Sequence, residues 1–368
     1  MAQPAPRTPG VFARWDGNGA VDAAAAPGWW PSTAEESERL LRSLRGVKVF
    51  EIGRSAGGRS ILAGAWGRRE DLPNRTCRSL ASAIAGGSVA AFYGEGQRAR
   101  QSLVFVGNAH GLEFEGTVAA LNMLSVVVTG KDLRGRAWPR LQRYGRKLRL
   151  VVIPHLNIDG RARVPWYRHS VGINDEDVRR LFFGDWKRGG RLEWARSKLT
   201  SPVPPDQVAP LGAYFNDHGV NLVYDTGLGV DPQPETKALL GFLREEMPDC
   251  VLLSHTDAGG LVQPPDAFIP ERYRQRQAQI AALVGARCKY EGSPIWRIPQ
   301  ESHGSGGEAL YQSDVVYHTC GALPLMVEFP AGYHATPGRF GEILDVGLYV
   351  LEEVLAFGAE FRFRPYDP

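Results

Sequence analysis

The chain has 368 residues, 43% of them hydrophobic, so it is long enough to bury a substantial core. Its formal net charge is only +3, which creates no field that would attract nucleic acid or an anionic membrane, and we expect neither as a partner. No apolar run is long enough for a membrane-spanning helix, and the first residues lack the apolar stretch of a signal peptide. We therefore expect a cytoplasmic protein whose four widely spaced cysteines are free thiols.

Residues 1–32 are rich in Ala, Pro and Gly, and we expect them to form an N-terminal extension before a single domain over 33–368. Ser32-Thr-Ala-Glu35 has the form of a capping box and predicts a helix that runs to about Leu44. Two strands follow, over 47–53 and 60–66, joined by a Gly-rich turn.

Beyond residue 100, short apolar runs alternate with helical patterns. The patterns predict strands over 103–106, 148–153, 251–253 and 323–329, and helices over 115–128, 235–246 and 339–355. This alternation favours an α/β fold with a mostly buried sheet and helices on both faces. The charged and Pro-rich stretch over about 172–210 breaks the rhythm, and we expect it to be an inserted loop.

The first chemical motif is His110-Gly-Leu-Glu113, which follows an apolar strand run and precedes a helix. A histidine and a carboxylate three residues apart at such a turn can both reach one ion, and catalytic zinc favours two histidines, one glutamate and a water. The competing interpretation is a polar turn with a glutamate at the helix start.

Two further polar residues accompany apolar strand runs, and ligands of open α/β sheets bind beyond the carboxyl ends of strands. His255 follows Val-Leu-Leu-Ser and suits a distant third ligand, although a hydrogen-bonded structural histidine explains it equally well. Glu328 lies inside Met-Val-Glu-Phe, where a buried carboxylate must be paired, protonated or used. A glutamate beside a zinc-bound water serves as general base and then general acid, whereas simple alternation would leave Glu328 facing solvent.

The order of His-x-x-Glu, Asn157-Ile-Asp159-Gly, His255 and Glu328 resembles the zinc metallocarboxypeptidase family, as do stretches near residues 51–61 and 234–239. The resemblance covers roughly residues 33–360. It implies one three-layer α/β/α domain around a mixed, mostly parallel sheet of about eight strands. It also implies one zinc ion per chain, held by His110, Glu113 and His255, with Glu328 as the catalytic glutamate.

The resemblance implies a recognition set that this sequence lacks in part. Family members place an Asn-Arg pair, which grips the substrate's terminal carboxylate, where this chain has Val223 and Tyr224. Asn221 stands where the family has an aspartate that orients the first zinc histidine.

Other site residues are expected at positions that the motifs fix less firmly. For the arginine that polarises the scissile carbonyl, Arg168 is the first candidate, with Arg163 and Arg188 behind it. Tyr224 and Arg163 are candidates for substrate binding, and His303 for the part of the family's mobile tyrosine.

The sequence therefore predicts a zinc-dependent hydrolase of peptide or amide bonds, most simply a metallocarboxypeptidase with altered C-terminal recognition, acting on a peptide or a small amide. One alternative is an N-acyl amide hydrolase akin to aspartoacylase and succinylglutamate desuccinylase. Another is an inactive zinc-binding module. The sequence leaves the oligomeric state open.

Overall fold

The computed structural model describes residues 26–71, 99–164, 175–197, 202–226, 230–257, 260–262, 269–293, 311–331 and 340–365. In chain order the elements are α1 (Ala34–Ser43), β1 (Lys48–Arg54), β2 (Ser60–Trp66), β3 (Ser102–Val106), α4 (Glu115–Thr129), α5 (Pro139–Gly145), β4 (Arg149–Ile153), α6 (Ile158–Arg163), α7 (Asp175–Phe182), β5 (Gly184–Trp186), α8 (Trp194–Ser197), η3 (Pro205–Gln207), β6 (Val208–Leu211), α9 (Pro234–Glu246), β7 (Cys250–Asp257), β8 (Gly260–Val262), α10 (Glu271–Tyr290), α11 (Gln312–Cys320), β9 (Leu323–Pro330) and α13 (Phe340–Glu360).

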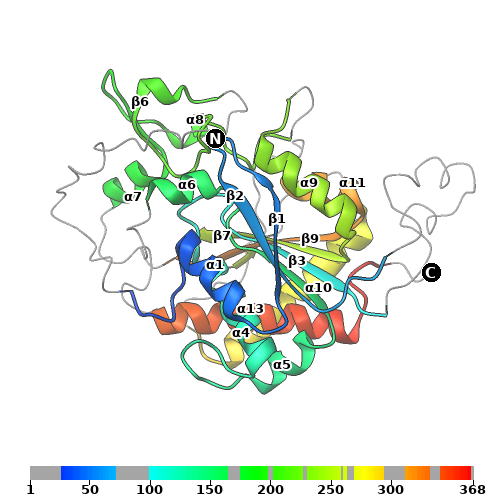
Figure 1. Cartoon of the computed structure of the whole chain (residues 1–368). Helices are drawn as coiled ribbons and strands as arrows, with labels where there is room; N and C mark the ends of the chain where they lie inside the picture. The colour runs from blue at the N-terminus through cyan, green and yellow to red at the C-terminus, as the bar shows by residue number, and fades with distance from the viewer. Residues whose placement is uncertain are drawn as a thin grey trace, which may run out of the picture.

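Seven strands form the central sheet, in the order β1-β2-β4-β3-β7-β9-β8 (Figure 1). The four strands β4, β3, β7 and β9 pair in parallel, whereas β2 is antiparallel to β1 and β4, and β8 is antiparallel to β9. This arrangement confirms the mixed, mostly parallel sheet. The carboxyl ends of the four parallel strands therefore meet at one end of the sheet, where α/β proteins bind ligands.

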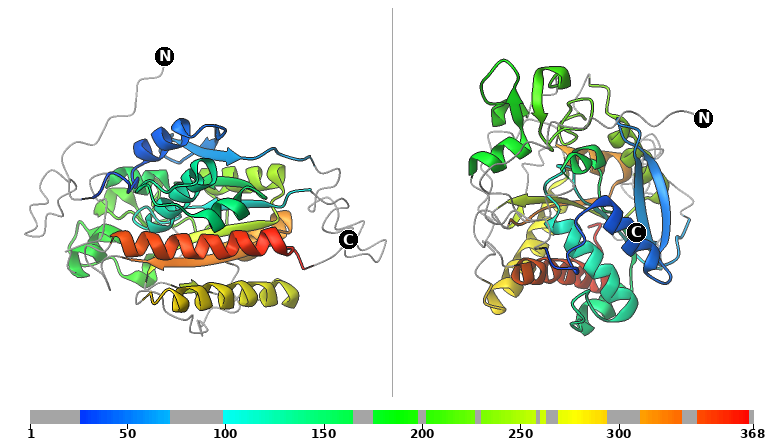
Figure 2. Two further views of the ribbon diagram at one scale, coloured as in Figure 1. Left: turned by 90° about the horizontal axis from the view of Figure 1, so that it is seen from below. Right: turned by 60° about the vertical axis from the view of Figure 1, so that its left-hand side comes forward.

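Both faces of the sheet are covered by helices, which explains why the central strands read as continuous apolar runs. Successive side chains of a strand point to opposite faces. Leu103 and Phe105 of β3 join a core with α4, α10 and α13, whereas Val104 and Val106 join a second core with α9 and α11. Figure 2 shows α13 on the face opposite to α9, with α10 packed beside α13.

The start of the domain differs from the expectation by a few residues. The N-cap of α1 is Thr33, whose hydroxyl accepts from the backbone N–H of Glu36, so the capping box is one residue later than predicted. Within the described end of the expected extension, Trp30 is 1% exposed and packs against Phe340 with ring centroids 5.1 Å apart.

Other differences lie where the sequence pattern is irregular. The 20-residue helix α10 was not expected, because its buried positions include polar Gln277 and its outer face is strongly charged. The segment expected as a loop over 172–210 contains two short helices, α7 and α8, and much of the small β5–β6 sheet in its described part. α13 ends five residues beyond the predicted position, at Glu360.

Three cysteines, Cys250, Cys288 and Cys320, are free and buried, as expected, and Cys77 lies outside the described residues. Within the described part of the chain, no helix is both long and apolar enough to cross a membrane.

The end of the sheet opposite to the strand carboxyl ends holds a buried ion pair that supplies a test of the fold. Arg149 at the start of β4 donates from Nε and Nη2 to the two carboxylate oxygens of Glu246, at 2.6 and 3.1 Å. Removing Arg149 leaves the buried Glu246 carboxylate with the Ser102 hydroxyl at 3.1 Å and Arg69 at 3.9 Å, so Arg149→Met should lower the free energy of unfolding by up to about 3–5 kcal/mol. The measurement is urea unfolding followed by circular dichroism.

The matched control is Arg42→Met, which breaks an Arg–Glu pair that is largely exposed and should cost at most about 1 kcal/mol. The double variant Arg149→Met/Glu246→Met should recover most of the loss. Equal losses for the buried and the exposed pair would contradict the prediction.

Candidate metal centre

Three neighbouring strands of the sheet carry the polar residues singled out in the sequence. His110 and Glu113 follow β3, His255 lies near the carboxyl end of β7, and Glu328 lies near the end of β9. Because β3, β7 and β9 are adjacent and parallel, these side chains reach the same end of the sheet. The structure therefore brings together residues that are more than two hundred positions apart in the chain.

Glu113 lies between two imidazole rings. The Nδ1 atoms of His110 and His255 are each 2.9 Å from a different oxygen of its carboxylate. One ligand atom from each of the three residues lies within 4.8 Å of the others, and all three side chains are buried. Burial raises the pKa of Glu113, but the attraction and hydrogen bonds of the two imidazoles outweigh it and hold that pKa below its usual range.

The orientation of His110 is fixed from its other side. Its Nε2 lies 3.1 Å from Oδ1 of Asn221, and the Asn221 amide nitrogen donates to the carbonyl of Ser197. Since Oδ1 can only accept, Nε2 carries a proton and Nδ1 is the atom left to bind a cation. The ring also stacks on Tyr214, with centroids 3.6 Å apart and planes 6° apart.

The His110 loop packs backbone against backbone on the Asn157-Ile-Asp-Gly segment. A side chain at Gly111 would place its Cβ 2.4 Å from the carbonyl carbon of Gly160, and one at Gly160 would meet the carbonyl oxygen of Ala213 at 2.3 Å. The side-chain oxygen of Asn157 accepts from the Gly160 N–H and caps α6. The Asn157-Ile-Asp-Gly segment therefore supports the loop that carries the first ligand.

Glu328 is placed beside the third ligand by strand register. It pairs with His255 between β9 and β7, and residues in register on adjacent strands point to the same face of the sheet. Its neighbours Val327 and Phe329 point into the core on the other face. Glu328 is half-buried, so part of its surface is open.

Tyr224 belongs to the same neighbourhood. Its pKa is raised to about 12, first by burial and then by Tyr311, Glu113 and Glu328. The phenol is therefore neutral at physiological pH. Its ring lies 6.4 Å from that of Tyr311, centroid to centroid, which adds a second phenol to this side of the centre.

The candidate arginines and His303 lie in different parts of the chain, and the structure describes two of the arginines. Arg163 donates from Nη1 to Asp217 at 2.5 Å and from Nη2 to the carbonyls of Gly212 and Phe215, so its role in substrate binding stays a prediction. Arg188 is exposed and lies over the Trp186 ring. Arg168 and His303 lie outside the described residues, and their roles also stay predictions.

The sequence motifs did not reveal three residues of the centre. Tyr214 stacks on His110, but nothing in its sequence context marks it. Asn108, two residues before His110, has a positive φ of 51°, which is uncommon outside glycine. Asparagine adopts this conformation more often than most residues do, so an asparagine directly after the strand was a sequence signal for this turn. Glu115 is buried, and desolvation raises its pKa to about 7.

Two imidazole nitrogens and one carboxylate that converge from buried positions are the donor set of catalytic zinc sites. A cation bound by all three would replace the Nδ1 protons and keep the Nε2 bond to Asn221, so the residues present fit this metal.

The sequence model of the zinc carboxypeptidase family matches residues 41–266, a span that contains His110, Glu113, Asn221 and His255. No curated protein sequence matches the chain.

Three solved structures illustrate the similarity in fold. The metallo-carboxypeptidase of Burkholderia cenocepacia matches with a TM-score of 0.56 and 13% identity, over 89% of this chain and 69% of that one. The metallo-carboxypeptidase of Pseudomonas aeruginosa in complex with (2-guanidinoethylmercapto)succinic acid matches with a TM-score of 0.54 and 15% identity, over 89% of this chain and 69% of that one. The carboxypeptidase A of Helicoverpa armigera matches with a TM-score of 0.54 and 16% identity, over 93% of this chain and 78% of that one.

The structural neighbours agree with the α/β/α architecture, and the family model covers more than half of the chain together with the three converging ligands. The chain belongs to the zinc carboxypeptidase family.

Proposed function

We propose that the protein is a zinc-dependent hydrolase of peptide or amide bonds, most simply a metallocarboxypeptidase with altered recognition of the substrate's C-terminus. The observation that carries the proposal is the placement of Glu328 in register with His255, beside a buried His-Glu-His donor set. One zinc ion per chain, held by His110, Glu113 and His255, would polarise the scissile carbonyl and acidify the attacking water.

Glu328 then moves the proton. Its carboxylate takes a proton from the attacking water as the oxygen adds to the carbonyl carbon, and it returns a proton to the amide nitrogen as the C–N bond breaks. The half-buried position suits both steps, because the carboxylate meets the substrate while Val327 and Phe329 hold the strand rigid from below.

The recognition side supports an altered specificity. Val223 has an apolar side chain that is buried, and its backbone N–H already donates to Asn221. It therefore offers a substrate carboxylate no hydrogen-bond donor. Tyr224 offers a neutral hydroxyl in place of a guanidinium, and Arg163 is engaged with Asp217. Arg168 and His303 remain our candidates for polarising the carbonyl and contacting the substrate. The same observations favour the second candidate function, hydrolysis of an N-acyl amide that needs no grip on a terminal carboxylate.

The first prediction concerns the metal. Wild-type protein purified without chelators should contain about one zinc per chain, because three buried donors converge on one point. His110→Ala/His255→Ala should contain almost none, whereas His318→Ala, which removes an exposed histidine of α11, should keep the wild-type content. Atomic emission on the three proteins gives the answer, and equal zinc in all three would rule out the site.

The second prediction separates metal binding from catalysis. Glu328→Gln should keep the zinc and lose at least about 100-fold in kcat, because positioned proton transfer contributes about 10²–10⁴. Glu271→Gln, an exposed glutamate of α10, is the matched control and should leave kcat unchanged. A Glu328→Gln protein within about threefold of the wild type would remove Glu328 from the mechanism.

The third prediction concerns the C-terminus of the substrate. A charge-assisted hydrogen bond contributes about 1.5–3 kcal/mol. Without the Asn-Arg pair, the ratio of kcat/KM for a free C-terminus to that for an amidated one should therefore be roughly ten- to a hundredfold lower than in an enzyme that has the pair. The measurement compares kcat/KM for a peptide with that for its C-terminal amide. We expect a residual preference supplied by another arginine such as Arg168. A ratio near one would exclude the carboxypeptidase while leaving the zinc hydrolase intact.

A further inference from the structure

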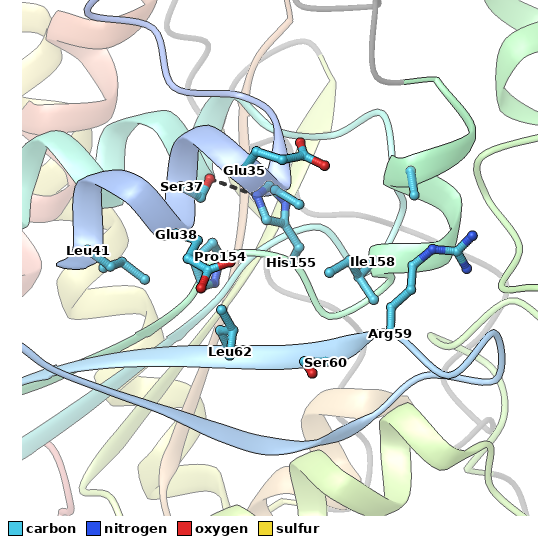
Figure 3. Close-up of a pocket in the computed structure, with 12 residues that line it drawn as sticks. Glu35, Ser37, Glu38, Leu41, Arg59, Ser60, Leu62, Pro154, His155 and Ile158 are labelled. Atoms are coloured by element: carbon cyan, nitrogen blue, oxygen red, sulfur yellow. Dashed lines mark hydrogen bonds between the residues drawn. The ribbon is translucent and has the colours of Figure 1, made fainter. Parts of the chain in front are cut away.

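A buried chain of hydrogen bonds leads from helix α1 to the loop that carries the first ligand. The Ser37 hydroxyl lies 2.8 Å from Nε2 of His155, and Nδ1 of His155 lies 2.7 Å from Oδ1 of Asn108 (Figure 3 shows the first of these bonds). Asn108 in turn donates from Nδ2 to the carbonyl of His110 at 3.1 Å. Ser37, His155 and Asn108 are 1%, 4% and 0% exposed, so water does not replace these bonds.

The direction of each bond follows from Asn108. Because its amide nitrogen faces the His110 carbonyl, its Oδ1 is an acceptor, and Nδ1 of His155 carries the proton. Nε2 of His155 is then the acceptor for the Ser37 hydroxyl. The Thr117 hydroxyl also lies 3.3 Å from Oδ1, although its closer partner is the carbonyl of Pro154 at 2.8 Å.

Asn108 occupies the turn where the chain leaves β3 for the ligand loop. Its φ of 51° lies in the left-handed region, which costs energy for a residue other than glycine unless surrounding contacts hold it. Its backbone carbonyl accepts from the N–H of Asn157, which ties the turn to the segment that supports Gly111. The side chain of Asn108 therefore fixes a strained turn two residues before a ligand.

The imidazole of His155 depends on its hydrogen bonds for its orientation. The residue lines a cavity of about 350 Å³ between α1, β2 and α6, bordered also by Leu41, Leu62 and Ile158 (Figure 3). None of the three ligand residues lines this cavity. Both ring nitrogens lie within hydrogen-bonding distance of a polar side chain, Nε2 of Ser37 and Nδ1 of Asn108, and these contacts orient the ring.

The order serine, histidine, amide also matches that of a nucleophile, its base and the group that orients the base. Burial, and next the charge of Arg161, lower the pKa of His155 to about 3. An imidazole this weakly basic is a poor proton acceptor at neutral pH, so the arrangement suits a fixed neutral connector better than a second hydrolytic site.

We propose that Ser37 and His155 are positioning residues for the metal centre, which act through Asn108 to hold the His110 loop in the geometry that binds zinc. The inference rests on the proposed zinc site. It goes beyond that site because it assigns a role in metal affinity to two residues that touch neither the metal nor the substrate.

The test compares two amide replacements of the same histidine. His155→Gln keeps a polar group toward Ser37 but loses the donor to Asn108, whereas His155→Asn places an amide nitrogen near the position of Nδ1 and keeps that donor. Changes in residues that orient metal ligands typically weaken binding by about 10- to 100-fold. We expect that loss of zinc affinity for His155→Gln, and a loss of less than about threefold for His155→Asn.

Zinc affinity is measured by competition with a chromophoric chelator, without substrate, and the visible spectrum of the Co²⁺-loaded proteins reports the ligand geometry. His318→Gln, an exposed histidine on α11, is the control and should match the wild type in both readouts. Ser37→Ala, which suits a helix, provides the second variant if His155→Gln does not fold. It should weaken zinc binding several-fold and shift the Co²⁺ spectrum.

Three results would overturn the proposal: unchanged zinc affinity in a folded His155→Gln protein, equal losses in the Gln and Asn variants, or a Ser37→Ala protein that matches the wild type in both readouts. A wild type that binds no zinc would instead refute the proposed function. A wild type that binds zinc but cleaves no peptide leaves the test of Ser37 and His155 valid, because that test measures zinc binding and needs no turnover.

Discussion

The contact on which this site depends is that of one buried carboxylate, Glu113, with the imidazoles of His110 and His255. Desolvation disfavours a charged carboxylate, and the two rings compensate for it within hydrogen-bonding distance. A divalent cation would compensate more strongly, because it carries its charge to all three donors at once. The fold brings the donors together by placing β3 and β7 side by side in parallel, and it buries all three donor side chains.

A second constraint follows from the first. The ligand loop must turn sharply after β3, and it does so by packing Gly111 against the backbone of Gly160, where no Cβ fits. Asn157 and Asn108 satisfy the backbone groups that this close approach would otherwise leave buried and unpaired. The support of the metal centre therefore consists largely of backbone contacts and amide side chains. Ser37 and His155 extend it through their hydrogen bonds to Asn108.

Under the proposed function, recognition of the substrate's C-terminus falls to Tyr224 at the position where the family resemblance places an arginine. Tyr224 would offer a neutral phenol there, and the candidate Arg163 is paired with Asp217. A neutral hydroxyl gives a weaker hydrogen bond to a carboxylate than a guanidinium does, but it also accepts uncharged groups. In the proposed enzyme, the catalytic residues would therefore accept a broader class of amides than a grip on a terminal carboxylate would.

The sequence by itself determined the elements whose cause is local. Period and composition predicted β3, α4, α9 and β9 within a few residues, and the three-residue spacing of His110 and Glu113 already places both at one turn. The sequence did not determine that Glu328 pairs with His255, because the register of parallel strands is set by packing across both faces of the sheet. Nor did it show that Arg163 pairs with Asp217, more than fifty positions further along the chain. Those assignments depend on distances between segments far apart in the chain, which only the tertiary structure sets.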